Sequence, residues 1–149
     1  MCLDYRIKLA DLDAESAYNY KHHVGWKYFL LGPSIALQHP TPKFCFFPYG
    51  KSLEVPLDRW ILAIPQRVPY LDRYGTYQSG FHIYLKQQSF TRMQRATPKK
   101  SLVVEYVVEW QGPIVVGLDA GAPCVVARKL FVPTDPQKFA TACYRPRNK

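Results

Sequence analysis

The run at residues 101–110 limits the folds open to this chain more than any other stretch. It reads Ser-Leu-Val-Val-Glu-Tyr-Val-Val-Glu-Trp, and β-branched and aromatic residues in this density favour a strand. After it, Gln111-Gly-Pro113 predicts an interruption, residues 114–118 a second strand, residues 119–123 a turn, and residues 124–132 a third strand. The last third of the chain is therefore predicted to form an antiparallel meander.

The N-terminal part predicts a strand, a short helix and a second strand. Residues 3–8 alternate apolar and polar side chains, as a half-buried strand does. Residues 11–20 are helical in composition, with Asp11 or Asp13 as the N-cap, and residues 24–31 read as a strand with Trp26, Tyr28 and Leu30 on one face. Residues 33–79 are rich in proline, so they predict short strands and irregular structure that wrap the core, with residues 60–64 as a brief buried segment.

Residues 77–95 link these two halves. Gly80 permits a tight turn or a close backbone approach, and residues 81–84 alternate like a strand. Residues 85–95 predict a short basic helix that directs Leu85, Phe90 and Met93 to the core and ends at Thr97-Pro98.

These elements predict an α+β fold: one twisted, mainly antiparallel sheet with one or two short helices packed on a face. A partly closed β-barrel is the alternative architecture. The chain of 149 residues has the length of one domain, and its apolar fraction of 48% is that of a folded protein, so we expect residues 1–149 to form a single domain.

Composition also bounds location and metal chemistry. The four cysteines are far apart and include no Cys-x-x-Cys pair, which argues against a zinc site. The sequence lacks an apolar run of membrane-spanning length and a signal-peptide core, so we expect a cytoplasmic protein with reduced thiols, no membrane contact and no cofactor or metal. His22-His23 are expected to cap the first helix rather than bind metal, and Cys2 as an N-terminal nucleophile is a remote alternative to an ordinary thiol.

The formal net charge of +9 is unevenly distributed. Residues 1–50 contain five basic and four acidic side chains, whereas residues 51–149 contain fifteen basic and seven acidic ones. The cations expected to bind an anionic partner lie in two groups, Lys86, Arg92, Arg95, Lys99 and Lys100 in a stretch without acids, and Arg145 and Arg147 in the C-terminal tail. Such groups attract nucleic acid, nucleotide-like ligands or an acidic protein surface, although the same charges also serve simply to keep an aromatic-rich domain soluble.

Part of the chain resembles small uncharacterised proteins common in bacteriophages and bacteria. The resemblance spans roughly residues 75–132 and rests on Gly80-Phe-His82 with a helix after it, on the strand that ends at Gly112, on residues 114–118, and on Val-Val-Ala-Arg at residues 125–128. It implies a viral or mobile-element accessory protein and no particular chemistry.

A second pattern suggests an enzyme. His82 and Tyr84 share one face of a predicted strand and are expected opposite Glu105 or Glu109 on a neighbouring strand. This set resembles the His-Tyr-Glu grouping of some ADP-ribosyltransferases, which implies aromatic rings that hold nicotinamide and a glutamate that supports the ribose. The structural alternative is a partly buried His82 whose ring nitrogens are satisfied by backbone groups.

Three functions follow from these patterns. The leading hypothesis is a non-enzymatic, phage-encoded protein that binds nucleic acid, a nucleotide-like ligand or an acidic host protein through a basic face, as an inhibitor of host defence would. The second is a small ADP-ribosyltransferase-like or phosphate-handling enzyme that uses His82, Tyr84 and Glu105 or Glu109. The third is a sponge for a cyclic nucleotide, with an aromatic and arginine pocket at a homo-oligomer interface.

Overall fold

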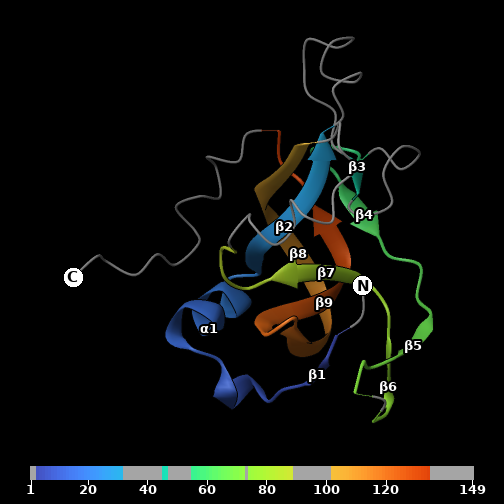
Figure 1. Cartoon of the computed structure of the whole chain (residues 1–149). Helices are drawn as coiled ribbons and strands as arrows, with labels where there is room; N and C mark the ends of the chain where they lie inside the picture. Colours follow the sequence, from blue (N-terminus) through green and yellow to red (C-terminus); the bar gives the residue numbers. More distant parts are fainter. Residues whose placement is uncertain (1–2, 32–44, 47–54, 73, 89–101, 135–149) are drawn as a thin grey trace.

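The computed structural model describes residues 3–31, 45–46, 55–72, 74–88 and 102–134. Their elements run along the chain as shown in Figure 1. In order they are β1 (Tyr5–Arg6), a 3-10 turn (Leu9–Asp11), α1 (Ala14–Lys21), β2 (Val24–Leu31), β3 (Cys45–Phe46), β4 (Trp60–Leu62), β5 (Arg67–Pro69), β6 (Thr76–Gln78), β7 (Phe81–Tyr84), β8 (Leu102–Asp119) and β9 (Ala122–Phe131).

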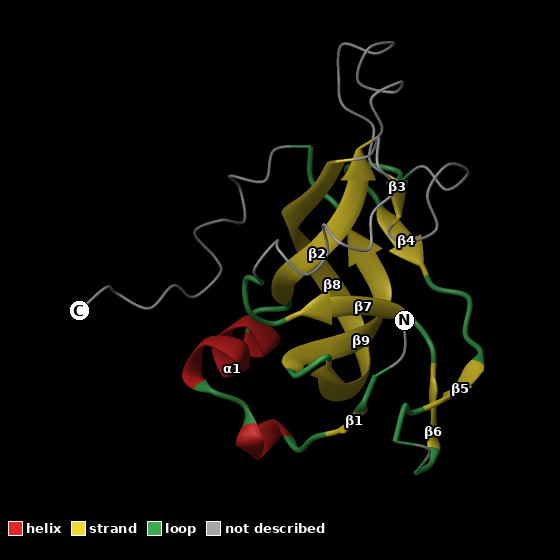
Figure 2. Cartoon of the chain, in the orientation of Figure 1, coloured by secondary structure: helices red, strands yellow, loops and turns green. Residues whose placement is uncertain are grey.

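The main sheet is antiparallel and has the strand order β1-β8-β2-β7-β9-β4, with β3 paired to β2. Because β8 also pairs with β9, the path β8-β2-β7-β9 closes partly into a ring, although the sheet is not a barrel. Strands β5 and β6 form a separate two-stranded sheet, and α1 lies at one end of the strands (Figure 2). The predicted α+β architecture with a mainly antiparallel sheet is confirmed.

Strand β8 organises this sheet. Its first half pairs with β2, from Leu102 opposite Leu31 to Glu109 opposite Val24, and its second half pairs with β9 and β1. The predicted break at residues 111–113 is wrong, because the strand continues through a bulge: Gly112 takes φ +67° and the register with β9 shifts between Pro113 and Val115. The irregularity shifts the register of β8 against β9 without ending the strand.

The predicted turn after β8 is present and is tighter than expected. Asp119 pairs with Ala122, which leaves Ala120 and Gly121 as a two-residue loop. Their φ values of 51° and 85° are both positive, as in the type I′ turns that connect twisted hairpin strands. Strand β9 therefore begins two residues before the predicted start at residue 124.

The N-terminal elements follow the prediction, except that the first strand is shorter than predicted. Strand β2 occupies the predicted residues 24–31, and Asp13 caps α1 by accepting a hydrogen bond of 2.8 Å from the Ser16 amide. The strand predicted at residues 3–8 is limited to Tyr5 and Arg6, because the chain turns into the 3-10 segment at Leu9.

Two apolar clusters occupy the two faces of the sheet. Trp26 and Tyr28 of β2 belong to one cluster, as predicted for residues of one face, and Phe29 belongs to the other. The predicted burial of residues 60–64 is wrong: Leu62 is 69% and Ile64 83% exposed, because β4 is the edge strand and pairs only with β9 in the described part of the sheet.

The stretch around Gly80 is confirmed in its strand and corrected in its helix. A Cβ on Gly80 would lie 2.5 Å from the Ala127 carbonyl oxygen, so the glycine permits the predicted close backbone approach. Residues 85–88 are not helical, because the Leu85 amide donates to the Pro123 carbonyl and the Gln88 amide to the Glu105 carboxylate. The remainder of the predicted helix lies outside the described residues, and no described helix has the length and apolar character needed to cross a membrane.

Candidate functional site

Strand β7 carries the two side chains that the sequence marked first, His82 and Tyr84. It lies between β2 and β9, with His82 opposite Val126 and Tyr84 opposite Cys124. Glu105 and Glu109 lie on β8 instead, which β2 separates from β7. The prediction that His82 and Tyr84 face these glutamates from an adjacent strand is therefore wrong, since strand order places β2 between them.

His82 belongs to a buried hydrogen-bond chain. The ring is 8% exposed, and its Nε2 lies 3.2 Å from the hydroxyl of Tyr77, which also accepts a bond of 2.9 Å from the Leu3 amide. Burial, and after it the positive charge of Lys27, lowers the pKa of His82 to about 3. The imidazole is therefore neutral at physiological pH. Its ring has the Tyr77 hydroxyl as one partner and the backbone of Gly80 as another, so the structural alternative is confirmed for the backbone contact.

Lys27 was not singled out by the sequence. Its ammonium is buried and donates a hydrogen bond of 2.9 Å to the carbonyl oxygen of His82. Burial lowers the pKa of Lys27 to about 8, an effect that the nearby Cys124 and Asp119 partly oppose. The only signal in the sequence was a lone lysine inside the apolar run of β2, a position where lysine is seldom fully buried.

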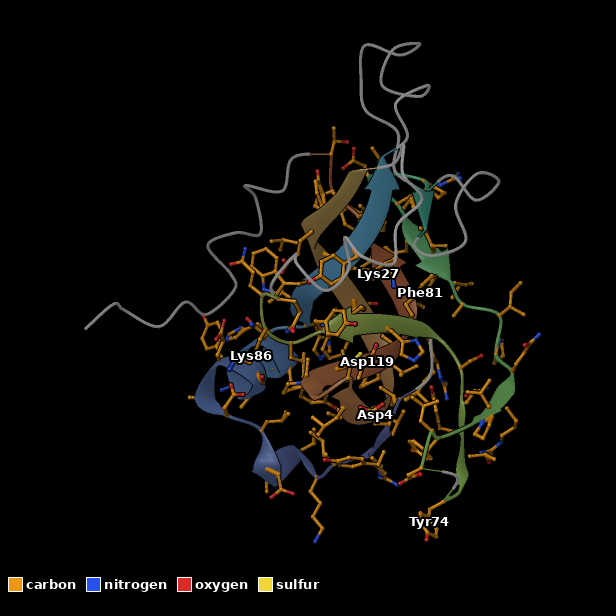
Figure 3. The ribbon with its side chains drawn as sticks, viewed as in Figure 1. Asp4, Lys27, Tyr74, Phe81, Lys86 and Asp119 are labelled. Atoms are coloured by element: carbon orange, nitrogen blue, oxygen red, sulfur yellow. The ribbon has the colours of Figure 1, made fainter. Side chains whose placement is uncertain are left out.

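Tyr84 and Asp119 form a second buried pair. The Tyr84 hydroxyl donates to Asp119 Oδ2 over 3.0 Å, and burial followed by the charge of Asp119 raises the pKa of that hydroxyl far above its ordinary value. Burial likewise raises the pKa of the neighbouring Cys124 thiol, so Cys124 does not supply a thiolate nucleophile. In Figure 3, the labels for Lys27 and Asp119 lie above and below β7. Tyr84 and Asp119 are therefore bonded to each other, and Lys27 is bonded to the backbone of β7.

Glu105 occupies a different place, at the start of the segment that contains most of the predicted anion-binding cations. It accepts a hydrogen bond of 2.8 Å from the amide of Gln88, the last described residue before residues 89–101. Burial raises the pKa of Glu105 to about 7, although the bond from Gln88 acts in the lowering direction. Its second oxygen, Oε2, is buried and has no hydrogen-bond partner among the described residues, which suits a carboxyl that holds a proton near neutral pH. Burial also raises the pKa of Glu109.

Lys86 is the one predicted anion-binding residue that the structure describes. Its Nζ lies 3.6 Å from Asp13 Oδ2, the carboxylate that caps α1, and both side chains are about two-fifths exposed. The other predicted anion-binding residues lie outside the described residues; they are Arg92, Arg95, Lys99, Lys100, Arg145 and Arg147.

The described part of the chain is electrically balanced. Its basic residues number nine, and they are Arg6, Lys8, Lys21, Lys27, Arg59, Arg67, Lys86, Arg128 and Lys129. Its acidic residues also number nine, and they are Asp4, Asp11, Asp13, Glu15, Asp58, Asp72, Glu105, Glu109 and Asp119. The whole formal excess of +9 therefore belongs to residues outside the described ranges.

The histidine pair after α1 has separate roles. His22 is the C-cap of the helix, as predicted for the pair, and its ring contacts that of Tyr18 with centroids 4.1 Å apart. His23 takes φ 55° and stacks on Trp110 at 4.5 Å. Among the residues that the structure describes, no group of three or more His, Cys, Asp or Glu is placed to hold a metal ion.

A surface groove of about 640 Å³ lies beside β1. Its lining consists of Arg6, Ile7, Lys8, Leu9, Tyr20, Pro113, Ile114, Val115 and Val116. Nothing in the sequence indicates this groove, because its two sides come from residues 6–20 and residues 113–116, which are far apart along the chain.

No protein-family model matches the chain, and no match was found among curated proteins or among solved structures.

Proposed function

We propose that this protein is a non-enzymatic, phage-encoded binding protein that engages a polyanionic partner, either nucleic acid or an acidic host protein, through the cations of residues 86–100 and of the C-terminal tail. The observation that supports this proposal is the charge distribution along the sequence: residues 86–100 hold five cations and no acidic residue, and +8 of the net charge of +9 lies in residues 51–149. A surplus confined to a few segments produces a directed field, whereas charge used only for solubility needs no such separation.

Residues 89–101 are the segment that we expect to make the principal contact. They contain Arg92, Arg95, Lys99 and Lys100 and no acidic residue, and Phe90 offers a ring for stacking on a base. Cations at this spacing fit a repeating anion such as a phosphate backbone or an acidic protein surface.

The enzyme alternative has less support. His82 is neutral and sealed, Tyr84 is bonded to Asp119, and Glu105 lies on a strand that does not neighbour β7. A catalytic histidine and glutamate require a shared open cleft, and strand order works against one here.

The first experiment measures binding to a labelled single-stranded oligonucleotide by fluorescence anisotropy across a salt series. Reversal of the four cations to glutamate (Arg92→Glu, Arg95→Glu, Lys99→Glu and Lys100→Glu) should weaken binding and reduce the slope of log K against log salt by roughly 3, at about 0.7 per phosphate contact on a single strand. The matched control is the variant Arg59→Glu, Arg67→Glu, Arg128→Glu and Lys129→Glu, which removes the same charge from exposed sites on the described body. This control variant should keep most of the slope of log K against log salt.

The second experiment separates the two classes of partner. Immobilised protein is incubated with host lysate, with and without nuclease, and the four-cation variant serves as the blank. A protein retained after nuclease by the parent chain, and lost with the variant, would identify an acidic protein as the partner. Equal behaviour of both four-residue variants in both experiments would contradict the proposal, because total charge and not residues 89–101 would then determine binding.

A further inference from the structure

The groove beside β1 arises where the N-terminal chain leaves the edge of β8 and later returns to it. The chain leaves at Ile7, whose amide donates to the Val116 carbonyl over 3.0 Å, and returns at His23, whose carbonyl accepts from the Trp110 amide over 2.9 Å. Between these two contacts, β8 has no strand neighbour on that side within the described ranges. Residues 8–22 form the 3-10 turn and α1 across this gap, and the groove lies beside the uncovered part of β8.

Apolar side chains contribute to both sides of the groove. Pro113–Val116 of β8 form one side, at the bulge, and Ile7, Leu9 and Tyr20 line the other. Tyr20 is held in position by its contact with Trp110, with ring centroids 5.4 Å apart, whereas Leu9 is 51% exposed. A volume of about 640 Å³ lies in the range of small-molecule sites.

The charges at the groove have one sign. Arg6 and Lys8 line it and are both exposed, and the lining contains no acidic residue. Neither cation forms an ion pair with any residue that the structure describes. An apolar surface flanked by two cations that no described carboxylate pairs with is complementary to an anion that carries an apolar body.

We propose that this groove binds a small amphipathic anion, an apolar chain or ring with a single carboxylate, sulfonate or phosphate group. The apolar body lies on Leu9 and Pro113, and the anionic group lies between Arg6 and Lys8. The groove belongs wholly to the described body, so the inference is independent of the proposed function of residues 89–101.

The test uses 8-anilinonaphthalene-1-sulfonate, which is itself a ring system with one anionic group. The folded full-length protein is titrated with this probe by fluorescence, and the probe is then displaced by decanoate, by phenyl phosphate or by the uncharged 1-decanol. We expect displacement by at least one of the two anions and much weaker displacement by 1-decanol. A preference for decanoate would indicate a lipid-like ligand, and a preference for phenyl phosphate would indicate a phosphate monoester; both results support the site.

Two groove variants and one control locate the binding. Arg6→Gln with Lys8→Gln should weaken decanoate or phenyl phosphate binding roughly fivefold or more, because both exposed charge contacts to the anion are lost. Leu9→Glu places a carboxylate in the lining and should abolish binding of the probe. Arg59→Gln with Lys129→Gln removes two cations that do not line the groove, and this control should bind like the parent.

A structural readout complements these affinities. Addition of the better anion should shift amide resonances of residues 6–9 and 114–116 in a ¹⁵N-correlation spectrum and leave those of β6 in place. Equal displacement by 1-decanol and the anions, unchanged affinity of the Arg6→Gln, Lys8→Gln variant, absence of displacement at millimolar anion, or shifts confined to other strands would each overturn the proposal.

Discussion

Glu105 couples a buried carboxyl to the backbone at the beginning of residues 89–101. Its pKa is raised by burial to about 7 in the folded protein, against an ordinary value of 4.5. Because the pKa of Glu105 is higher in the folded protein than in the unfolded chain, the protonated carboxyl contributes its full stability at pH values below the unfolded pKa. This contribution is lost as the pH rises through about 7.

Glu105→Gln should therefore change the pH dependence of stability. The variant should be more stable than the parent at pH 8 by roughly 1–2 kcal/mol, at about 1.4 kcal/mol per pKa unit with a discount for partial exposure, and similar to it at pH 4.5. Urea unfolding at intervals between these pH values measures the difference. Asp11→Asn, which removes a charge from an exposed position, serves as control, and a Glu105→Gln difference that stays constant over this range would contradict the prediction.

His82 should remain neutral throughout the range in which the protein is folded. Burial and Lys27 lower its pKa to about 3, so stability that depends on the neutral ring is complete above the ordinary value of 6.5 and is lost as pH falls toward 3. The ¹⁵N shifts of the ring should stay those of a neutral tautomer from pH 8 to 5. In concentrated urea the same ring should titrate near about 6.5, and titration near that value in the folded protein would show that the imidazole contacts water.

At the scale of elements, the packing of β7 and β9 depends on Gly80. A Cβ there would lie 2.5 Å from the Ala127 carbonyl oxygen, and that backbone atom cannot move without disturbing the pairing. Gly80→Ala should cost roughly 2–4 kcal/mol of unfolding free energy, as overpacking against backbone does. Gly121→Ala is the matched control, because a Cβ there would meet no atom within 4 Å and only the positive φ would cost about 1 kcal/mol. Chemical denaturation of both variants compares the two costs, and equal losses would contradict the steric argument.

The hairpin of β8 and β9 offers a stabilising change. Ala120 holds φ 51°, a conformation that costs an alanine about 1 kcal/mol, and the next residue is glycine. Ala120→Asn would create the Asn-Gly pair that favours type I′ turns, so it should raise the unfolding free energy by roughly 0.5–1 kcal/mol. Thermal melts of this variant and of Ala10→Asn, at an exposed position in the 3-10 turn, provide the comparison. A lower melting temperature for Ala120→Asn would show that the loop uses another geometry in solution.

At the scale of the whole molecule, the partly closed sheet predicts cooperative unfolding. Trp26 and Trp110 belong to the two different apolar clusters, and both strands that carry them are joined along the β2–β8 pairing. Loss of one cluster exposes the shared strands, so the two should unfold together. In a Trp60→Phe background, Trp110→Phe and Trp26→Phe each leave a single buried tryptophan, and their fluorescence midpoints in urea should coincide with the circular dichroism midpoint of the same variant. Separate midpoints would reveal two independently folding units.

The sequence predicted those features that depend on local pattern. The α+β class, the strand at residues 24–31, the Asp13 cap and the turn after residue 118 all follow from periodicity and turn chemistry. Long-range features were mispredicted. The bulge kept β8 continuous through Gly112-Pro113, tertiary hydrogen bonds held residues 85–88 out of a helix, and edge placement exposed Leu62.

The candidate sites show the same division. That His82 and Tyr84 share a face follows from the period of a strand, but their separation from Glu105 by β2 depends on strand order, which one sequence does not encode locally. Lys27 and the groove beside β1 were missed for a related reason, since both are created by segments that meet only in the folded sheet.

The long pairing of β2 with β8 also affects biosynthesis. Residues 24–31 emerge from the ribosome early, yet residues 102–109, which pair with all of β2, are made much later. Until then the nascent chain exposes Trp26 and Phe29 without their final neighbours, which makes chaperone capture and misassembly natural competitors of folding. A slow codon stretch or a stall before residue 102 should therefore lower the yield of native protein more than the same delay placed after β9.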